Sequence, residues 1–351
     1  MKPVRVLVVD DSAYSRRSIT KMLEGVPGIQ VVGYAVDGEE GIRQVISLKP
    51  DLVTLDLEMP RMDGFTLLRI LAGRFNLPVI VVSVQSDAEK VFRALELGAV
   101  DFVAKPSSDA SAALLSITRD LQYKVGQAVT AQVKKYQRLS DHAVPHQNHR
   151  AAGRSAGKSS IELVAIAAST GGPPALQGIF SAFERVYPFG VVVAQHMPPG
   201  FTKAFAERLN RASLFEVREA QDGDLIRPGL ALIAPGGSSL QLEAATGMVR
   251  ARVLPPDPDY RYNPSADALF SSCAPLYGAR MLAVVLTGMG NDGSQGIRLV
   301  KQHGGQVMAE AEESSVVYGM PREAVATGCV DRVEALAAIP CAILDCGNFE
   351  H

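Results

Sequence analysis

The chain has 351 residues, of which 47% are hydrophobic and 21% are charged, and its formal net charge is -2. This length favours two domains that each bury a core, and the small net charge gives no electrostatic reason to expect nucleic acid or an anionic membrane as a partner. Acidic residues interrupt the first apolar run too early for a signal peptide, and no later run approaches the roughly 18 apolar residues of a membrane span. We therefore expect a cytoplasmic protein that does not insert into a membrane.

The first third of the chain alternates short apolar runs with helical patterns, such as Asp37 to Leu48. Five strand-helix units with short connections predict an α/β domain of the flavodoxin-like, doubly wound type with a parallel sheet. The expected strands are Val4 to Val9, Gln30 to Ala35, Asp51 to Leu55, Pro78 to Val82 and Val100 to Val103.

Acidic residues follow two of these strands. Asp10 and Asp11 come after the first strand, and Asp56 comes after the third. Carboxylates that crowd together at one sheet edge are typical of a Mg²⁺ site with oxygen ligands. Capping of the next helix is an alternative that accounts for Asp11 beside Ser12, but Asp56 does not stand at a helix start.

Two further polar side chains end the fourth and fifth strands. Ser83 follows the fourth, and Lys105 lies at the end of the fifth. A hydroxyl and an ammonium aimed at Asp56 would stabilise negative charge on a group attached there, as a phosphoryl-transfer site requires. Taken singly, the lysine could be a surface residue and the serine a turn residue.

The segments Val8 to Ser12, Leu55 to Gly64 and Ala94 to Pro106 together resemble the response-regulator receiver domain. The resemblance implies a Mg²⁺-dependent phosphoacceptor and a set of supporting residues. These are Asp56 as phosphoacceptor, Asp10, Asp11, Asp56 and the backbone carbonyl of Glu58 as metal ligands, and Ser83, Phe102 and Lys105 as switch residues.

A polar, aperiodic stretch from Gln137 to Ser160 separates the two halves and is typical of a linker. We predict a receiver domain over residues 1–122, a helix extension and flexible linker over 123–158, and a catalytic domain over 159–351. No basic recognition helix of the helix-turn-helix type appears after the linker, which argues against a transcription factor.

The second half again alternates strand-like and helical patterns, and it predicts a second doubly wound, mostly parallel α/β domain. Val249 to Leu254 could add a hairpin. The expected strands are Ile161 to Ala168, Phe189 to Ala194, Leu230 to Ala234, Met281 to Leu286 and Gln306 to Ala309, and the expected helices are Gly200 to Asn210, Pro264 to Tyr277 and Ser294 to Gln302.

Ser169, His196 and Asp292 each follow one of these strands. Because side chains converge outside the carboxyl ends of parallel strands, the three could meet as a nucleophile, a base and the group that orients the base. The turn Ser169 to Pro174 would also bring backbone N–H groups at a helix start close to the hydroxyl. Taken singly, Ser169 and Asp292 could each be a helix N-cap or a loop residue.

The order Ser, His, Asp is not that of α/β-hydrolases, chymotrypsin or subtilisin, so the scaffold is a different one. These segments, with Pro264 to Phe270 and Ser315 to Glu323, resemble the protein-glutamate methylesterases of chemotaxis. The resemblance implies that Ser169 attacks the γ-methyl ester of a receptor glutamate and that methanol leaves. His196 would take the proton, Asp292 would orient His196, and the Met289 N–H, with support from Thr170, would form the oxyanion hole. Deamidation of receptor glutamines is also implied.

The implied partners are the cytoplasmic helices of methyl-accepting chemoreceptors and a sensor histidine kinase of the chemotaxis type. No cofactor is expected for the ester hydrolysis itself, and we expect the receiver to inhibit the esterase until it is phosphorylated. Ala167 departs from the usual family pattern, which has glycine there. Two alternatives stay open, namely a catalytically weak regulator or scaffold of a non-chemotactic chemosensory pathway, and a hydrolase of another ester or amide.

Overall fold

The computed structural model describes residues 3–83, 88–105, 117–126, 161–245 and 247–350. The chain divides into two compact units between Lys135 and Tyr136, inside the segment 123–158 expected as helix extension and linker, of which the structure describes residues 123–126. The limits of that linker therefore stay predictions. No helix in the described ranges is long and apolar enough to cross a membrane.

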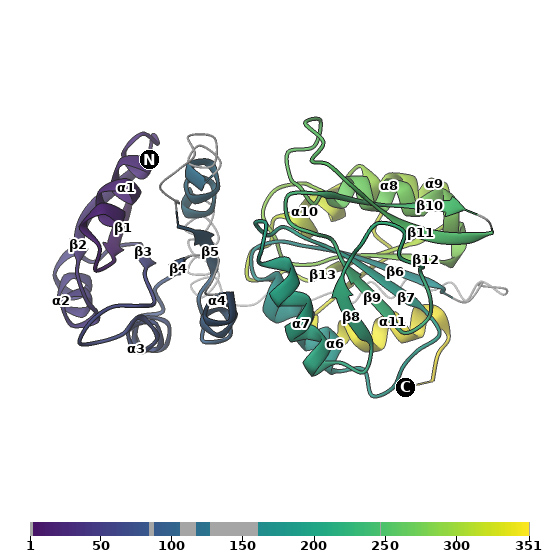
Figure 1. The fold of residues 1–351 in the computed structure, drawn as a ribbon, viewed down its shortest axis with the longest axis horizontal. Coiled ribbons are helices and arrows are strands. Elements are labelled where there is room, and N and C mark those ends of the chain that lie inside the picture. Colours follow the sequence, from purple (N-terminus) through teal and green to yellow (C-terminus); the bar gives the residue numbers. More distant parts are fainter. Residues whose placement is uncertain (1–2, 84–87, 106–116, 127–160, 246, 351) are drawn as a thin grey trace, which may run out of the picture. The chain divides into compact units, whose positions relative to one another are not determined.

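The first unit is a five-stranded parallel sheet in the order β2-β1-β3-β4-β5, with helices packed on it (Figure 1). The expected strands are confirmed to within one or two residues. The strands are β1 (Val4–Val9), β2 (Ile29–Ala35), β3 (Leu52–Leu55), β4 (Val79–Ser83) and β5 (Asp101–Ala104). The helices are α1 (Ala13–Glu24), α2 (Gly38–Leu48), α3 (Gly64–Ile70), which continues as a π-helical turn (Leu71–Phe75), α4 (Ala88–Glu96) and a helix over residues 117–126.

Side-chain caps begin the first three helices of this unit. Ser12 accepts a hydrogen bond from the Ser15 N–H at the start of α1, and Asp37 and Asp63 do the same for α2 and α3. Ser12 caps α1, so the neighbouring Asp11 is left for another role. Leu121 and Val125 of the helix 117–126 pack with α1 against the sheet.

The second unit is built on a seven-stranded parallel sheet in the order β14-β13-β12-β6-β7-β9-β8. A separate antiparallel hairpin, β10 and β11, confirms the expectation for Val249 to Leu254. The strands are β6 (Leu163–Ala168), β7 (Gly190–Gln195), β8 (Glu216–Glu219), β9 (Leu230–Ile233), β10 (Ser239–Ala245), β11 (Met248–Leu254), β12 (Met281–Val285), β13 (Gln306–Glu310) and β14 (Arg332–Glu334).

Helices cover both faces of this sheet, as Figure 1 shows. They are α6 (Gly172–Ser181), α7 (Thr202–Ala212), α8 (Ala266–Tyr277), α9 (Gly296–Gln302), α10 (Met320–Ala326) and α11 (Ile339–Gly347). The three central strands β12, β6 and β7 are buried along their whole length, which explains why they read as continuous apolar runs. The topology reverses at β6, since the chain adds β7 on one side of it and β12 on the other. A crevice at the carboxyl ends of these strands is therefore the expected place for a site.

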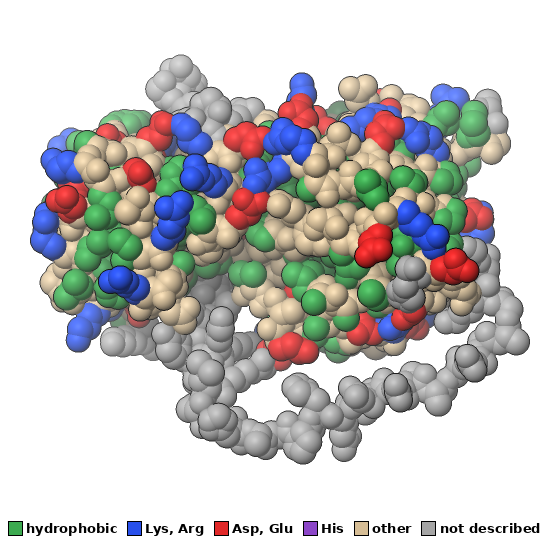
Figure 2. Space-filling model, turned by 90° about the horizontal axis from the view of Figure 1, so that it is seen from below, with side chains coloured by type: hydrophobic (Ala, Val, Ile, Leu, Met, Phe, Trp, Pro, Cys, Tyr) green, Lys and Arg blue, Asp and Glu red, His purple; other side chains and the backbone are tan. Residues whose placement is uncertain are grey.

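Ala167 lies inside β6, is fully buried and pairs with Val285 and Ala194 on the flanking strands. Its backbone is ordinary strand, so the methyl group that replaces the family's glycine causes no strain there. On the face drawn in Figure 2, acidic and basic side chains are interspersed and do not gather into one basic surface.

Candidate active site

Ser169 follows β6 directly and lies in the turn that leads into α6. Its N–H donates to the Thr287 carbonyl over 3.0 Å, and its own carbonyl accepts from the Gly172 N–H over 2.8 Å. The N-cap of α6 is Gly171, with φ of 80°, so the N-cap alternative for Ser169 is wrong. A Cβ on Gly171 would lie 2.6 Å from the Cβ of Val316, which is why this position needs glycine.

Gln195, the last residue of β7, ties the ends of β6 and β7 together. Its amide Nε2 donates to the Ser169 carbonyl over 2.9 Å and to the His196 carbonyl over 3.1 Å. The side chain is buried, so both bonds are sheltered from water. The backbone carbonyls of Ser169 and His196 are thus held by one side chain.

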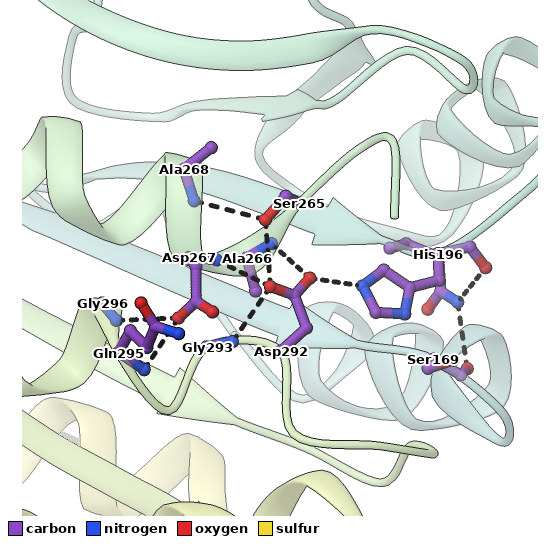
Figure 3. Close-up of polar contacts among 11 residues, drawn as sticks. Ser169, His196, Ser265, Ala266, Asp267, Ala268, Asp292, Gly293, Gln295 and Gly296 are labelled. Atoms are coloured by element: carbon purple, nitrogen blue, oxygen red, sulfur yellow. Dashed lines mark hydrogen bonds and ion pairs between the residues drawn. The ribbon is translucent and has the colours of Figure 1, made fainter. Parts of the chain in front are cut away.

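His196 and Asp292 form the second half of the expected triad. The Nε2 of His196 lies 2.7 Å from Oδ2 of Asp292 (Figure 3). The imidazole stacks on the Tyr262 ring, with 4.2 Å between centroids and 14° between planes. Within the described residues, Nδ1 is buried without a hydrogen-bond partner, and the Ser169 hydroxyl makes no hydrogen bond to the ring. In Figure 3 the ring lies between Asp292 and Ser169.

Asp292 does not cap the helix that follows it, because the N-cap of α9 is Gln295. Its carboxylate instead lies against the start of α8. Four donors besides His196 surround it, namely Ser265 Oγ (2.9 Å), Ala266 N (2.7 Å), Asp267 N (3.0 Å) and Gly293 N (3.1 Å). Burial alone would raise the pKa of Asp292, but the hydrogen bond from His196, its charge and these backbone donors lower it. The carboxylate therefore stays ionised and holds the imidazole in place.

A second carboxyl close to Asp292 belongs to Asp267, in the first turn of α8. Oδ1 of Asp267 accepts from the Gln295 N–H over 2.9 Å and from the Gly296 N–H over 2.7 Å, so it stabilises the start of α9. Burial raises the pKa of Asp267 to about 6, and the nearby negative charge of Asp292 adds to this effect. The Asp292 carboxylate thus binds the first N–H groups of α8, and the Asp267 carboxyl binds N–H groups at the start of α9.

Gly288 and Met289 lie beside the nucleophile turn. A Cβ on Gly288 would lie 2.8 Å from the Cβ of Ser169, so this loop passes very close to the serine. Met289 is buried, and its N–H donates to no acceptor in the described residues. Thr170 is buried as well, and its carbonyl accepts from the Thr287 hydroxyl over 2.9 Å.

In the first unit, Asp10, Asp11 and Asp56 meet as the strand-end pattern predicts. One carboxylate oxygen of each lies within 4.8 Å of the others. Lys105 Nζ lies 2.6 Å from Oδ2 of Asp56 and 3.2 Å from Oδ2 of Asp10. Burial raises the pKa of both Asp10 and Asp56 against the opposing effect of Lys105, and their mutual repulsion adds to the rise at Asp10.

This cluster fits a hard divalent cation. Oδ2 of Asp10 is buried with only the Lys105 ammonium beside it among the described residues, and three carboxylates crowd around this one lysine. The Glu58 N–H donates to Oδ1 of Asp56 over 3.3 Å, which brings the backbone of Glu58 to the edge of the cluster.

The expected switch residues lie at the same sheet edge. Ser83 and Phe102 are buried, and the Lys105 N–H donates to the Ser83 carbonyl over 2.7 Å. Lys124 Nζ donates to the Phe102 carbonyl over 2.6 Å, so the helix 117–126 contacts the strand that carries this aromatic residue.

Several residues of the catalytic unit were not singled out from the sequence. Ser265 could have been predicted, because a serine directly before a helical pattern is a common N-cap. In the structure its hydroxyl accepts from the Ala268 N–H at the start of α8. Gln195 and Tyr262 carried none, since one is an ordinary strand residue and the other a loop aromatic. Their roles follow from contacts between segments far apart in the chain.

The fold and the two sites define a response regulator whose output unit is an α/β domain with a Ser-His-Asp arrangement. The model of the response regulator receiver domain matches residues 6–116, and that of the CheB methylesterase matches residues 164–343. The chain belongs to the CheB methylesterase family.

Two relatives are similar over nearly the whole chain. A protein-glutamate methylesterase/protein-glutamine glutaminase of Geobacter sulfurreducens is 54% identical over 96% of this chain and 95% of its own length. One of Myxococcus xanthus is 47% identical over the same shares. The crystal structure of the CheB methylesterase catalytic domain of Thermotoga maritima matches with a TM-score of 0.52 and 40% identity, over 53% of this chain and 99% of that one. The expected α/β fold in two domains is confirmed.

Proposed function

We propose that this chain is a phosphorylation-regulated serine esterase that hydrolyses glutamate γ-methyl esters in chemoreceptors and deamidates receptor glutamines. The observation that carries the proposal is the 2.7 Å contact between His196 and Asp292 beside the turn of Ser169, at the carboxyl edge of the adjacent strands β6, β7 and β12. The names of the relatives support the same ester and amide substrates.

The chemistry follows from the orientation of the imidazole. Because Nε2 of His196 is held by Asp292, Nδ1 is the nitrogen that takes the proton from the Ser169 hydroxyl as the oxygen attacks the ester carbonyl. The Met289 N–H stabilises the oxyanion of the tetrahedral intermediate, and Thr170 supports the turn. The proton on His196 then goes to the departing methoxide, and methanol leaves. Water hydrolyses the acyl-serine by the same steps in reverse order, while an amide substrate releases ammonia.

In the receiver, we propose that Asp56 is the phosphoacceptor and that Asp10, Asp11, Asp56 and the Glu58 carbonyl hold Mg²⁺. The cation supplies charge neutralisation for phosphoryl transfer when it is bound. Lys105 stabilises the negative charge on Asp56, and Ser83 and Phe102 respond to it. A sensor histidine kinase of the chemotaxis type is the proposed phosphodonor. Since this kinase and the receptor helices act inside the cell, we propose a cytoplasmic location.

Methanol release from membranes that carry methylated chemoreceptors tests the function directly. We expect release by the full chain, and faster release when acetyl phosphate and Mg²⁺ are present. A fragment of residues 159–351 should act faster than the unphosphorylated full chain, because it lacks the inhibitory receiver. Absence of methanol under all three conditions would contradict the proposal and favour a scaffold role.

A further inference from the structure

Glu310, the last residue of β13, is a carboxyl group with 0% exposure that the catalytic steps do not use. One of its oxygens accepts from the Thr287 N–H over 2.7 Å, and the other accepts from the Ser314 hydroxyl over 2.9 Å. No ion pair to Glu310 occurs among residues that the structure describes. A buried carboxyl without a cation is costly to the folded state, so its presence beside the site calls for a physical reason.

Thr287 links Glu310 to the nucleophile turn. Its carbonyl accepts from the Ser169 N–H over 3.0 Å, and its hydroxyl donates to the Thr170 carbonyl over 2.9 Å. The same hydroxyl accepts from the Val317 N–H over 3.0 Å. Every polar atom of Thr287 is therefore engaged, and Glu310 is the only partner of its N–H in the described chain.

The position of Thr287 matters for a second reason. It directly precedes Gly288 and Met289, the loop that passes within van der Waals contact of Ser169. A shift of the Thr287 peptide would move the serine backbone and the Met289 N–H together. A misplacement of about 1 Å between reacting groups is enough to slow an enzyme roughly 100-fold.

We propose that Glu310 is a positioning residue for the esterase: it fixes Thr287, and Thr287 fixes the peptide groups on both sides of the Ser169 side chain. The inference rests on the proposed function, because it assumes that Ser169 is the nucleophile. Glu310 touches neither substrate nor reacting atoms in this account.

The role depends on an acceptor oxygen and not on negative charge. Burial raises the pKa of Glu310, and the bonds from Thr287 and Ser314 oppose this rise. The nearest charged groups on the neighbouring strand are Glu334, in register with Glu310, and Arg332, which pairs with Glu334. A protonated carboxyl still offers its carbonyl oxygen to the Thr287 N–H, and so does an amide. Glu310→Gln is therefore the conservative substitution.

The test uses the full-length protein, with methanol release from methylated receptor membranes and labelling of Ser169 by a serine-reactive fluorophosphonate. Glu310→Met keeps the side-chain length but lacks an acceptor. We expect it to lower kcat about 10- to 100-fold and to slow labelling in parallel, with KM within about twofold of the wild type. Glu310→Gln should restore both rates, and Glu334→Met is the matched control that should leave them unchanged.

Wild-type rates in Glu310→Met would overturn the inference, and so would a Glu310→Gln variant as slow as Glu310→Met. If Glu310→Met does not fold, Thr287→Val, which cuts the bond to the Thr170 carbonyl, must show the same loss confined to kcat. Normal kcat in that variant also contradicts the inference. A wild-type protein that neither releases methanol nor loses labelling on Ser169→Ala contradicts the proposed function itself, which separates the two failures.

Discussion

Asp56 of the receiver and Asp292 of the catalytic unit are both buried carboxylates at the carboxyl edge of a parallel sheet, yet their surroundings are opposite. Asp56 lies among other carboxylates with one lysine, and burial raises its pKa. Asp292 accepts hydrogen bonds from five groups, which lower its pKa despite burial.

The difference shows how one residue type serves two kinds of chemistry. The receiver cluster holds three carboxylates and one lysine, a composition that fits a divalent cation. The catalytic unit compensates Asp292 from within, and Nδ1 of His196 stays buried without a hydrogen-bond partner among the described residues.

Ser169→Ala should have the largest effect, and it should change the catalytic activity without changing phosphorylation of the receiver. We expect methanol release to fall by a factor on the order of 10⁴ or more, because triad members act as a unit. Labelling of the receiver by acetyl phosphate should be unchanged, and so should thermal unfolding, since the Ser169 hydroxyl makes no hydrogen bond to the His196 ring. Near-normal methanol release by the folded variant would show that Ser169 is not the nucleophile.

Gly288→Ala tests whether the catalytic site depends on close packing between the backbone at Gly288 and Ser169. The added methyl group would lie 2.8 Å from the Ser169 Cβ and 2.5 Å from the Met320 Sδ. We expect a loss of activity of roughly 100-fold through displacement of the reacting groups. Gly178→Ala, at a helical position where no atom lies within 4 Å of the new Cβ, is the matched control and should be fully active.

Asp56→Asn changes the receiver alone. It should abolish Mg²⁺-dependent labelling by acetyl phosphate and remove the stimulation of methanol release, while basal activity stays measurable. A coupling of about 1–3 kcal/mol between domains corresponds to a stimulation of roughly 5- to 150-fold. Asp63→Asn, which keeps a good helix cap outside the cluster, should still be labelled. Persistent labelling of the Asp56→Asn protein would place the acceptor elsewhere.

The smallest effect, on stability, is expected at Asp267, because burial and the negative charge of Asp292 both disfavour its ionised form. Its pKa is about 6 in the folded protein against 3.8 unfolded, so between these values the native state binds more protons. Stability therefore falls as pH rises through this window and is level above it. Asp267→Asn, whose side-chain oxygen accepts the same two N–H groups, should be more stable than the wild type by about 1 kcal/mol above pH 6, after allowance for solvent screening.

Denaturant unfolding of the 159–351 fragment at pH 4 and pH 7 measures this difference. The advantage of the Asn variant should shrink toward pH 4, because the wild-type carboxyl is then largely protonated in the folded state and partly protonated in the unfolded state. An advantage that is equal at both pH values would mean that Asp267 is not the titrating group.

The sheets and the strand-end residues were predictable because the central strands are buried on both faces, and parallel strands bring their carboxyl ends together. The edge strands β8 and β14 were missed. Each is three or four residues long and contains charged residues, Glu216 and Arg218 in one and Arg332 and Glu334 in the other. Short, charged edges lack the apolar run that identifies a strand.

Within the catalytic site, Ser169, His196 and Asp292 could be predicted from the sequence, but the contacts that hold them could not. Gln195, Tyr262 and Glu310 act on partners that lie between 23 and 66 positions away or on adjacent peptide groups, so no local spacing marks them. The sequence likewise does not predict that Nε2 of His196 contacts Asp292, because this depends on the rotation of the side chain.

Asp292 also bears on how relatives of this protein can be interpreted. Its carboxylate caps α8 through the Ala266 and Asp267 N–H groups as well as holding His196. A relative that gave up ester hydrolysis would still use this aspartate at the start of α8, so retention of the aspartate does not by itself show activity. The Ser169 hydroxyl makes no comparable hydrogen bond to the residues that the structure describes. Among pseudoenzymes of this lineage, loss of the serine should come first, and the serine position is the one by which a silent member is recognised.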